Sequence, residues 1–308
     1  MRAFIFPGQG SQAVGMGAAL ADASRTARDV FDEVDEALGQ KLFKLMREGP
    51  DDELKLTENA QPAIMAHSIA VFRTLGLHLE DVASFVAGHS LGEYSALCAA
   101  GSLDLPTTAK LLKLRGQAMQ RAVPVGEGAM AALLGADLAL AQKIAEAAAQ
   151  GEVCTVANDN DPSQVVISGS KAAIDRAIAI AKDMGAKRAV PLPVSAPFHC
   201  PLMQPAAEAM RDALGYVVVE QPGVPLFANV TAQPQTDPDT IRNQLVEQVT
   251  GMVRWRESVA NMVDAGVHEF VEIGGKVLGP MVKRIAPDAR ITSVVTIEDI
   301  EGLAKEIA

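Results

Sequence analysis

The pentapeptide GHSLG at residues 88–92 constrains the fold more than any other segment of the chain. It follows an apolar run at residues 83–87, which is typical of a buried strand, and it precedes a helical pattern. A G-x-S-x-G sequence in this context is typical of a nucleophile elbow, a sharp strand-to-helix turn that holds a serine in strained backbone geometry. The pentapeptide therefore favours a fold in which strands alternate with helices.

Short apolar runs alternate with helical patterns toward both ends of the chain, which is the rhythm of a mostly parallel sheet covered by helices. The chain has 308 residues, of which 49% are hydrophobic, so it can bury a large core in one or two domains. We expect strands at residues 2–6, 83–87, 226–230, 267–273 and 291–295, and helices at residues 24–38, 62–75, 107–122 and 254–265.

The middle of the chain follows a different pattern between two groups of proline and glycine residues. There we expect a strand at 129–134, a helix at 138–150, a strand at 153–157, a turn at 158–162, a strand at 164–168, a helix at 171–184 and a strand at 187–191. This βαββαβ order is that of the ferredoxin-like fold. The sequence thus predicts a large α/β domain from residues 1–123 and 195–308 and a ferredoxin-like insert at residues 124–194. A cleft between two such domains is a common place for a substrate.

Ser90 is a candidate nucleophile. Glycines on both sides relieve the crowding of a tight turn, so the serine hydroxyl would project freely. The N–H of Leu91, at the start of the following helix, could donate to an oxyanion formed at the attacked carbonyl. The alternative is an ordinary glycine-rich turn in which Ser90 caps the helix.

A serine nucleophile needs a base, most often histidine. His199, in the segment SAPFHC, follows a predicted strand and could reach the domain interface on a loop. The other histidines lie next to the serine, near a loop, in a helical pattern or in a strand pattern (His89, His78, His67 and His268). Elimination therefore favours His199.

Arg115 lies on the apolar face of the helix predicted at residues 107–122, together with Leu111 and Met119. An arginine that points inward needs an anionic partner, which can be a protein carboxylate or the carboxylate of a ligand. The sequence leaves both alternatives open.

The glycine-rich segment PGQGSQ at residues 7–12 resembles a nucleotide-binding loop only superficially. The acidic residue expected about 20 positions later should end a second strand, whereas residues 29–38 have a helical pattern. Gln9 could instead present its backbone N–H to the active site, as a second donor for an oxyanion.

The composition opposes several classes of function. A net charge of −11 opposes nucleic-acid binding, which requires a dense basic surface. No run approaches the roughly 18 consecutive apolar residues that a membrane-spanning helix requires. The three cysteines are widely separated, which argues against a disulfide framework and offers no metal-ligand spacing. We therefore expect no bound metal. Because the N-terminal apolar run is too short for a signal peptide, we also expect a cytoplasmic protein.

Segments spread over nearly the whole chain resemble the malonyl-CoA:acyl-carrier-protein transacylases of fatty-acid synthesis, which are related to the acyltransferase domains of polyketide synthases. These segments are FPGQGSQ, TENAQPA, GHSLGEYSALCAAG, KLRGQAM, NDNDPSQVVISG, APFHCPLM, LVEQV and VRWRESV. The resemblance implies a hydrolase-like α/β domain that carries a small ferredoxin-like insert. It also implies transfer of a malonyl group from malonyl-CoA to the phosphopantetheine thiol of acyl carrier protein through a malonyl-serine intermediate.

The resemblance further implies roles for individual residues. Ser90 looks like the acylated nucleophile and His199 like its base, with the backbone carbonyl of Gln248 orienting the histidine in place of an aspartate. Arg115 resembles the residue that binds the malonyl carboxylate. Gln9 and Leu91 resemble the two residues whose backbone N–H groups donate to the oxyanion. Phe198, directly before His199, resembles the residue found there in the malonyl-selecting relatives.

The family acts without a bound cofactor, because the CoA thioester is itself a substrate. Its other partner, acyl carrier protein, is acidic, so we expect a local basic patch, for which Lys187, Arg188, Lys283 and Arg284 are candidates.

Two other functions remain open from the sequence. One is a serine esterase or thioesterase, in which water accepts the acyl group. The other is a non-catalytic module that binds a carrier protein.

Overall fold

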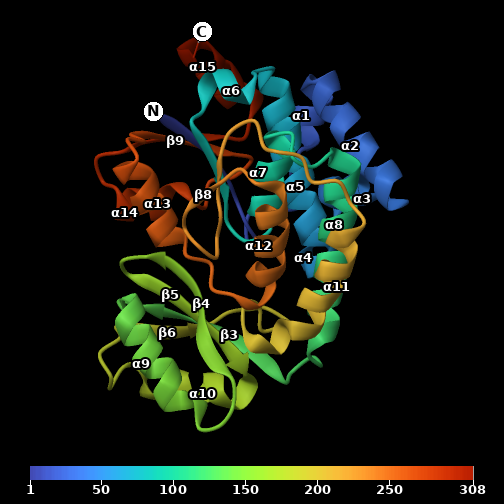
Figure 1. Cartoon of the computed structure of the whole chain (residues 1–308). Coiled ribbons are helices and arrows are strands. Elements are labelled where there is room, and N and C mark those ends of the chain that lie inside the picture. Colours follow the sequence, from blue (N-terminus) through green and yellow to red (C-terminus); the bar gives the residue numbers. More distant parts are fainter. Residues whose placement is uncertain (308) are drawn as a thin grey trace.

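The computed structural model describes residues 1–307, which form two β-sheets (Figure 1). The strands of the larger sheet are β1 (Arg2–Phe6), β2 (Phe85–Gly88), β7 (Leu226–Phe227), β8 (Pro234–Gln235), β9 (Glu269–Ile273) and β10 (Arg290–Val294). Their order is β10-β9-β1-β2-β7-β8, in which the first five run parallel and β8 runs antiparallel to β7. This arrangement confirms the predicted α/β class.

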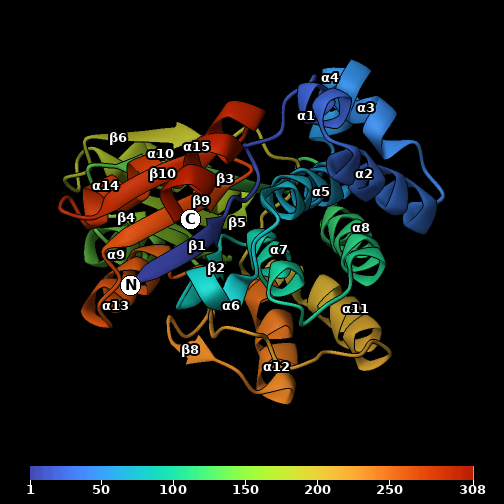
Figure 2. The same cartoon turned by 90° about the horizontal axis from the view of Figure 1, so that it is seen from above.

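Helices cover both faces of the larger sheet (Figure 2). They are α1 (Ala18–Ala23), α2 (Arg25–Leu38), α3 (Leu42–Glu48), α4 (Asp51–Lys55), α5 (Thr57–Leu75), α6 (Leu79–Val82), α7 (Gly92–Ala99), α8 (Leu105–Ala122), α11 (Gln204–Gly215), α12 (Pro238–Thr250), α13 (Trp255–Asp264), α14 (Gly279–Ile285) and α15 (Ile297–Ile307), with a 3₁₀ turn η1 (Pro201–Met203). Within residues 1–307, every helix is too short or too polar to span a membrane.

The alternation of side chains along β1 explains the two helical layers. Ala3 and Ile5 point to one face, where they pack with Trp255 of α13 in one apolar core. Phe4 and Phe6 point to the other face and join the larger core, which contains residues of α2, α5, α7 and α8. The sheet is therefore buried on both sides, as parallel sheets usually are.

In the large domain, two predicted elements differ by three or more residues at one end. The strand expected at residues 226–230 ends at Phe227, because the chain turns back into β8 with a hydrogen bond from the N–H of Ala228 to the oxygen of Gln233 (3.1 Å). The helix expected from residue 62 begins at Thr57. Pro62 lies in its second turn, where proline removes a single backbone hydrogen bond.

The smaller sheet lies within the predicted insert. Its strands are β3 (Gly128–Leu134), β4 (Cys154–Asp161), β5 (Gln164–Ser170) and β6 (Arg188–Pro191), and its helices are α9 (Leu138–Ala149) and α10 (Lys171–Ala181). All pairs are antiparallel in the order β4-β5-β3-β6, and both helices pack on one face with a core of their own. The βαββαβ order is confirmed, whereas the boundaries at residues 124 and 194 stay a prediction.

The turn predicted at residues 158–162 is wrong for its first four positions, which continue β4 to Asp161. These positions face the large domain. The buried carboxylates of Asp159 and Asp161 form ion pairs of 2.8 Å with Arg256 and Arg284, respectively. Asparagine and aspartate usually favour turns, but here ion pairs with another part of the chain stabilise an extended strand.

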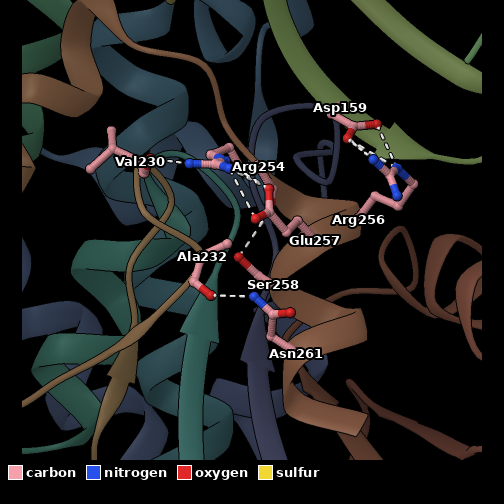
Figure 3. A network of polar contacts seen from close by, with 8 residues as sticks. All are labelled: Asp159, Val230, Ala232, Arg254, Arg256, Glu257, Ser258 and Asn261. Carbon is pink, nitrogen blue, oxygen red and sulfur yellow. Dashed lines mark hydrogen bonds and ion pairs between the residues drawn. The ribbon is translucent and has the colours of Figure 1, made fainter. Parts of the chain in front are cut away.

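Figure 3 shows how α13 is fixed beside this contact. Arg254 forms an ion pair with Glu257 (2.7 Å) and donates to the oxygen of Val230 (3.4 Å). Asn261, about two turns further along the helix, donates to the oxygen of Ala232 (2.8 Å). The start of α13 is thereby bound to the segment that follows β7, which also carries a residue of the site described next.

Candidate active site

Ser90 lies in a sharp turn between β2 and α7, with a backbone φ of 55°. This left-handed conformation is strained for a residue with a side chain. A Cβ atom added to Gly88 would lie 1.9 Å from the carbonyl carbon of Gly92, and one added to Gly92 would lie 2.3 Å from the oxygen of Phe6. The turn therefore requires both glycines, as expected for a nucleophile elbow.

The side chain of His199 meets Ser90 from the loop that follows β6. Its Nε2 lies 2.8 Å from Ser90 Oγ, and its Nδ1 lies 2.8 Å from the main-chain oxygen of Gln248. A carbonyl oxygen only accepts hydrogen bonds, so Nδ1 carries the proton and Nε2 is left to accept the hydroxyl proton of the serine. Burial, with the charge of Arg115, lowers the pKa of His199 to about 3. The imidazole is therefore a neutral base.

Arg115 is 1% exposed and points from α8 into the same site. Its Nη2 lies 3.1 Å from Ser90 Oγ and 2.9 Å from Gln248 Oε1, and its Nη1 lies 2.7 Å from Gln61 Oε1. Among residues 1–307, no carboxylate lies within 4.0 Å of this guanidinium. The alternative of a structural ion pair is thus not found, and the buried cation remains available to an anionic ligand.

A cavity of about 470 Å³ opens at Ser90 and His199. The insert contributes Met130 and the segment 192–194 to its wall, and Phe198 completes the apolar part. The predicted cleft therefore lies where the insert meets the large domain. Its apolar lining with a few convergent polar groups is typical of a small-molecule site.

The two predicted oxyanion donors follow the carboxyl ends of neighbouring strands: Gln9 lies in the loop after β1, and Leu91 lies in the turn after β2. Gln9 is exposed and lines the cavity, whereas the side chain of Leu91 is buried and its backbone begins α7. Neither backbone N–H donates a hydrogen bond to another group of residues 1–307. Both are consequently free to bind an oxygen of a ligand.

Sequence reasoning missed several residues that hold the site. Asn229 accepts from the N–H of Ser90 (2.8 Å) and donates to the oxygen of Gly88 (2.7 Å). It follows β7, which neighbours β2, so the strand order could have indicated it. Gln61 accepts a hydrogen bond from Arg115 and belongs to the segment TENAQPA. Glu93 accepts one from Gln248 and belongs to the segment GHSLGEYSALCAAG.

The other histidines lie apart from this chemistry. His89 points away from the serine, as expected, with its Nε2 2.8 Å from Asn160 Oδ1 on β4. His67 is buried in α5, where burial lowers its pKa to about 4. His268 lies 2.9 Å from the N-terminal amine. Across residues 1–307 no three His, Cys, Asp or Glu side chains lie where they could share a metal ion.

Three of the four basic candidates come together. Lys187, Arg188 and Arg284 line one groove of about 480 Å³, although Arg284 is also paired with Asp161. Lys283 donates instead to the oxygen of Pro287 and does not line this groove. Two basic segments far apart in the sequence therefore form one surface at the junction of insert and large domain.

Comparison with known proteins identifies the family of this chain. Residues 3–278 match the family described as acyl transferase domain. The malonyl CoA-acyl carrier protein transacylase of Bacillus subtilis is 45% identical over 304 residues, which cover 97% of this chain and 95% of that one. An acyl-carrier-protein-S-malonyltransferase from Bartonella henselae has a TM-score of 0.97 at 52% identity, over 99% of both chains. A malonyl-transacylase solved in complex with its type II PKS acyl-carrier protein has a TM-score of 0.96 at 40% identity, also over 99% of both chains. The chain therefore belongs to the acyl transferase domain family and is an acyltransferase similar to the malonyl CoA-acyl carrier protein transacylases.

Proposed function

We propose that the protein transfers a malonyl group from malonyl-CoA to the phosphopantetheine thiol of acyl carrier protein, with a malonyl-serine intermediate. The observation that carries this proposal is the buried Arg115, which has no carboxylate partner and lies 3.1 Å from the hydroxyl of Ser90. A donor whose acyl group ends in a carboxylate supplies the missing anion. The similar malonyl CoA-acyl carrier protein transacylase and the malonyl-transacylase solved with its acyl-carrier protein support the same donor and acceptor.

In the first half-reaction, His199 Nε2 takes the hydroxyl proton of Ser90 while Oγ bonds to the thioester carbonyl carbon. The oxyanion accepts hydrogen bonds from the backbone N–H groups of Gln9 and Leu91. The carbon–sulfur bond then breaks, and the imidazolium returns its proton to the sulfur of CoA. The product is malonyl-Ser90 with a neutral imidazole.

In the second half-reaction, the phosphopantetheine thiol gives its proton to His199 and its sulfur attacks the malonyl ester. The carbon–oxygen bond breaks, and Ser90 Oγ recovers the proton. Thioester and serine ester are close in energy, so both half-reactions should run in either direction. The mechanism uses side chains, backbone N–H groups and the CoA thioester alone, without a bound cofactor.

The groove of Lys187, Arg188 and Arg284 is a candidate docking surface for the acidic carrier protein. Complementary charge steers such partners to a surface and fixes their orientation. The cytoplasmic location of the protein stays a prediction.

Intact mass after incubation with malonyl-CoA alone tests the proposal. We expect wild-type protein to gain one malonyl group, Ser90→Ala to gain none, and Ser95→Ala, which alters another buried serine of α7, to behave like wild type. Rapid loss of the group to water, without transfer to added carrier protein, would favour the esterase or thioesterase. Absence of any mass increment in the wild type would favour the non-catalytic module.

A further inference from the structure

A buried carboxylate lies beneath the nucleophile turn without a direct ion pair. Glu93, in the first turn of α7, is 1% exposed. Its Oε2 accepts from Gln248 Nε2 (2.5 Å) and from the main-chain N–H of Asn229 (3.3 Å). No Lys or Arg nitrogen of residues 1–307 lies within 4.0 Å of it. A buried carboxyl group without an ionic partner is costly compared with an apolar side chain, so its retention at this place needs a reason.

The side-chain amide of Gln248 separates Glu93 from Arg115. Gln248 Oε1 accepts from Arg115 Nη2 (2.9 Å), while Nε2 donates to the carboxylate on the opposite side. A guanidinium only donates and a carboxylate only accepts, so the two charges fix the orientation of the amide from both ends. Arg115 is thereby held in place without being neutralised by direct contact.

Glu93 also supports the strained serine. Glu93 accepts from the main-chain N–H of Asn229, and the side chain of Asn229 in turn accepts from the N–H of Ser90. Gln248 Nε2 also donates to the main-chain oxygen of Ser90 (3.0 Å). Both main-chain polar groups of the serine are therefore bonded to residues that contact this carboxylate. A left-handed backbone persists only where its surroundings fix it.

We propose that Glu93 is a positioning residue for the acyl transfer, which acts through the Gln248 amide to present Arg115 to the carboxylate of the acyl donor. This inference rests on the proposed function and adds a residue to it. When the donor binds, its carboxylate and that of Glu93 share one guanidinium. We therefore expect Glu93 to take up a proton on binding, because a second negative charge nearby raises the pKa of a carboxyl group.

The neighbouring charges are consistent with this proton uptake. Burial already raises the pKa of Glu93 to about 7, against the hydrogen bonds from Gln248 and Asn229 and the charge of Arg115. The other titratable groups around the network are Tyr94 on α7 and His89 and His199 on loops. Burial raises the pKa of Tyr94 and lowers that of both histidines, so all three stay neutral near pH 7.

Two substitutions separate the hydrogen bonds of Glu93 from its charge. Glu93→Gln keeps an acceptor oxygen for both donors, so it should retain most of the malonyl-transfer activity that an apolar substitution loses. Glu93→Met has a similar length but no acceptor, so kcat/KM for malonyl-CoA should fall by roughly 10- to 100-fold through misplacement of Arg115. Transfer of an acetyl group, which has no carboxylate, should fall much less. Glu269→Gln is the matched control, because it alters a buried glutamate of β9 that is paired with Arg2 of β1, and it should change the kinetics with neither acyl donor.

Calorimetry measures the proton directly. The Ser90→Ala variant should bind malonyl-CoA without reacting, and titrations in two buffers of different ionisation enthalpy should report proton uptake near pH 7. The double variant Ser90→Ala/Glu93→Gln should show none, and acetyl-CoA should cause none in either protein.

Three results would overturn the assignment: equal loss for both donors in Glu93→Met, unchanged kinetics in that variant, or the same proton uptake with and without Glu93. If Glu93→Met does not fold, the calorimetric comparison still decides. Failure of the proposed function is recognised separately, because the wild-type protein would then gain no malonyl group.

Discussion

The imidazole of His199 is oriented by a main-chain oxygen, that of Gln248, which lies 2.8 Å from Nδ1. A carbonyl accepts this hydrogen bond without the full negative charge that a carboxylate would place beside the ring. The arrangement therefore does little to favour the imidazolium, and burial together with Arg115 lowers the pKa of His199 to about 3.

This pKa predicts the acid side of the activity profile. His199 binds a proton only near pH 3, so the neutral base persists as the pH falls from 7 to 5. We expect kcat/KM for malonyl-CoA, which reports groups of the free enzyme, to show no decrease over this range. Rates of acyl-enzyme formation on a stopped-flow instrument would measure it. A decrease with a midpoint near 6.5 that persists in Glu93→Gln, which removes the other group that titrates in this range, would contradict the neutral-base assignment.

Replacement of Arg115 by alanine should separate the two acyl donors. The substitution leaves the substrate carboxylate without its cation in a largely dry site, at a cost of about 2 to 5 kcal/mol in malonyl transfer. Acetyl transfer should hold steady or rise, because an unpaired buried cation is removed. Arg121→Ala, on an exposed face of the same helix, is the control. Parallel loss of both activities with a lower Tm would show that Arg115 is structural.

Substitution of Asn229 by alanine should weaken the serine turn. It removes the acceptor of the Ser90 N–H and the donor to Gly88, at a cost of about 1 to 3 kcal/mol for polar groups left unpaired in a buried place. We expect a lower Tm and slower acyl-enzyme formation with both donors. Asn261→Ala, which removes one hydrogen bond of α13, should lower the Tm without slowing acylation. The reverse pattern would remove Asn229 from the site.

His67 should make a measurable contribution to the pH dependence of stability. Its folded-state pKa of about 4 lies below that of an unfolded histidine, so between pH 6.5 and 4.5 only the unfolded chain binds its proton. Relative to a His67→Gln variant, the wild type should lose about 1.4 kcal/mol of unfolding free energy per pH unit as the pH falls through this range. Denaturant titrations at three pH values would test this. A difference that stays constant with pH would show that His67 has a normal pKa.

Much of the fold could be predicted because its signals are local. Apolar runs of strand length and helical spacing predicted the strands and helices of both sheets, and the glycines of GHSLG predicted the turn whose crowding the structure shows. The resemblance to an acyltransferase family is likewise confirmed. The roles of the site residues stay predictions that the experiments above address.

The failures have one physical cause. The extension of β4 through Asp161 depends on ion pairs with Arg256 and Arg284, about 100 positions away in the chain. Asn229 supports the serine turn only because β7 lies beside β2 in the sheet. Local propensity carries no information about such distant partners. Neither the extension of β4 nor the contact of Asn229 with the serine turn could therefore be predicted from a single sequence.

The contacts along the end of β4 have a consequence for what can enter the cleft. Swinging the insert outward would break the two ion pairs of Asp159 and Asp161, together with the Asn160 hydrogen bond to His89, the residue next to the nucleophile. The end of β4, which carries the cavity-lining residue Asn158, is thereby held against the large domain. Under the proposed function, both the acyl donor and the phosphopantetheine thiol therefore reach Ser90 through a cavity whose wall depends on these contacts.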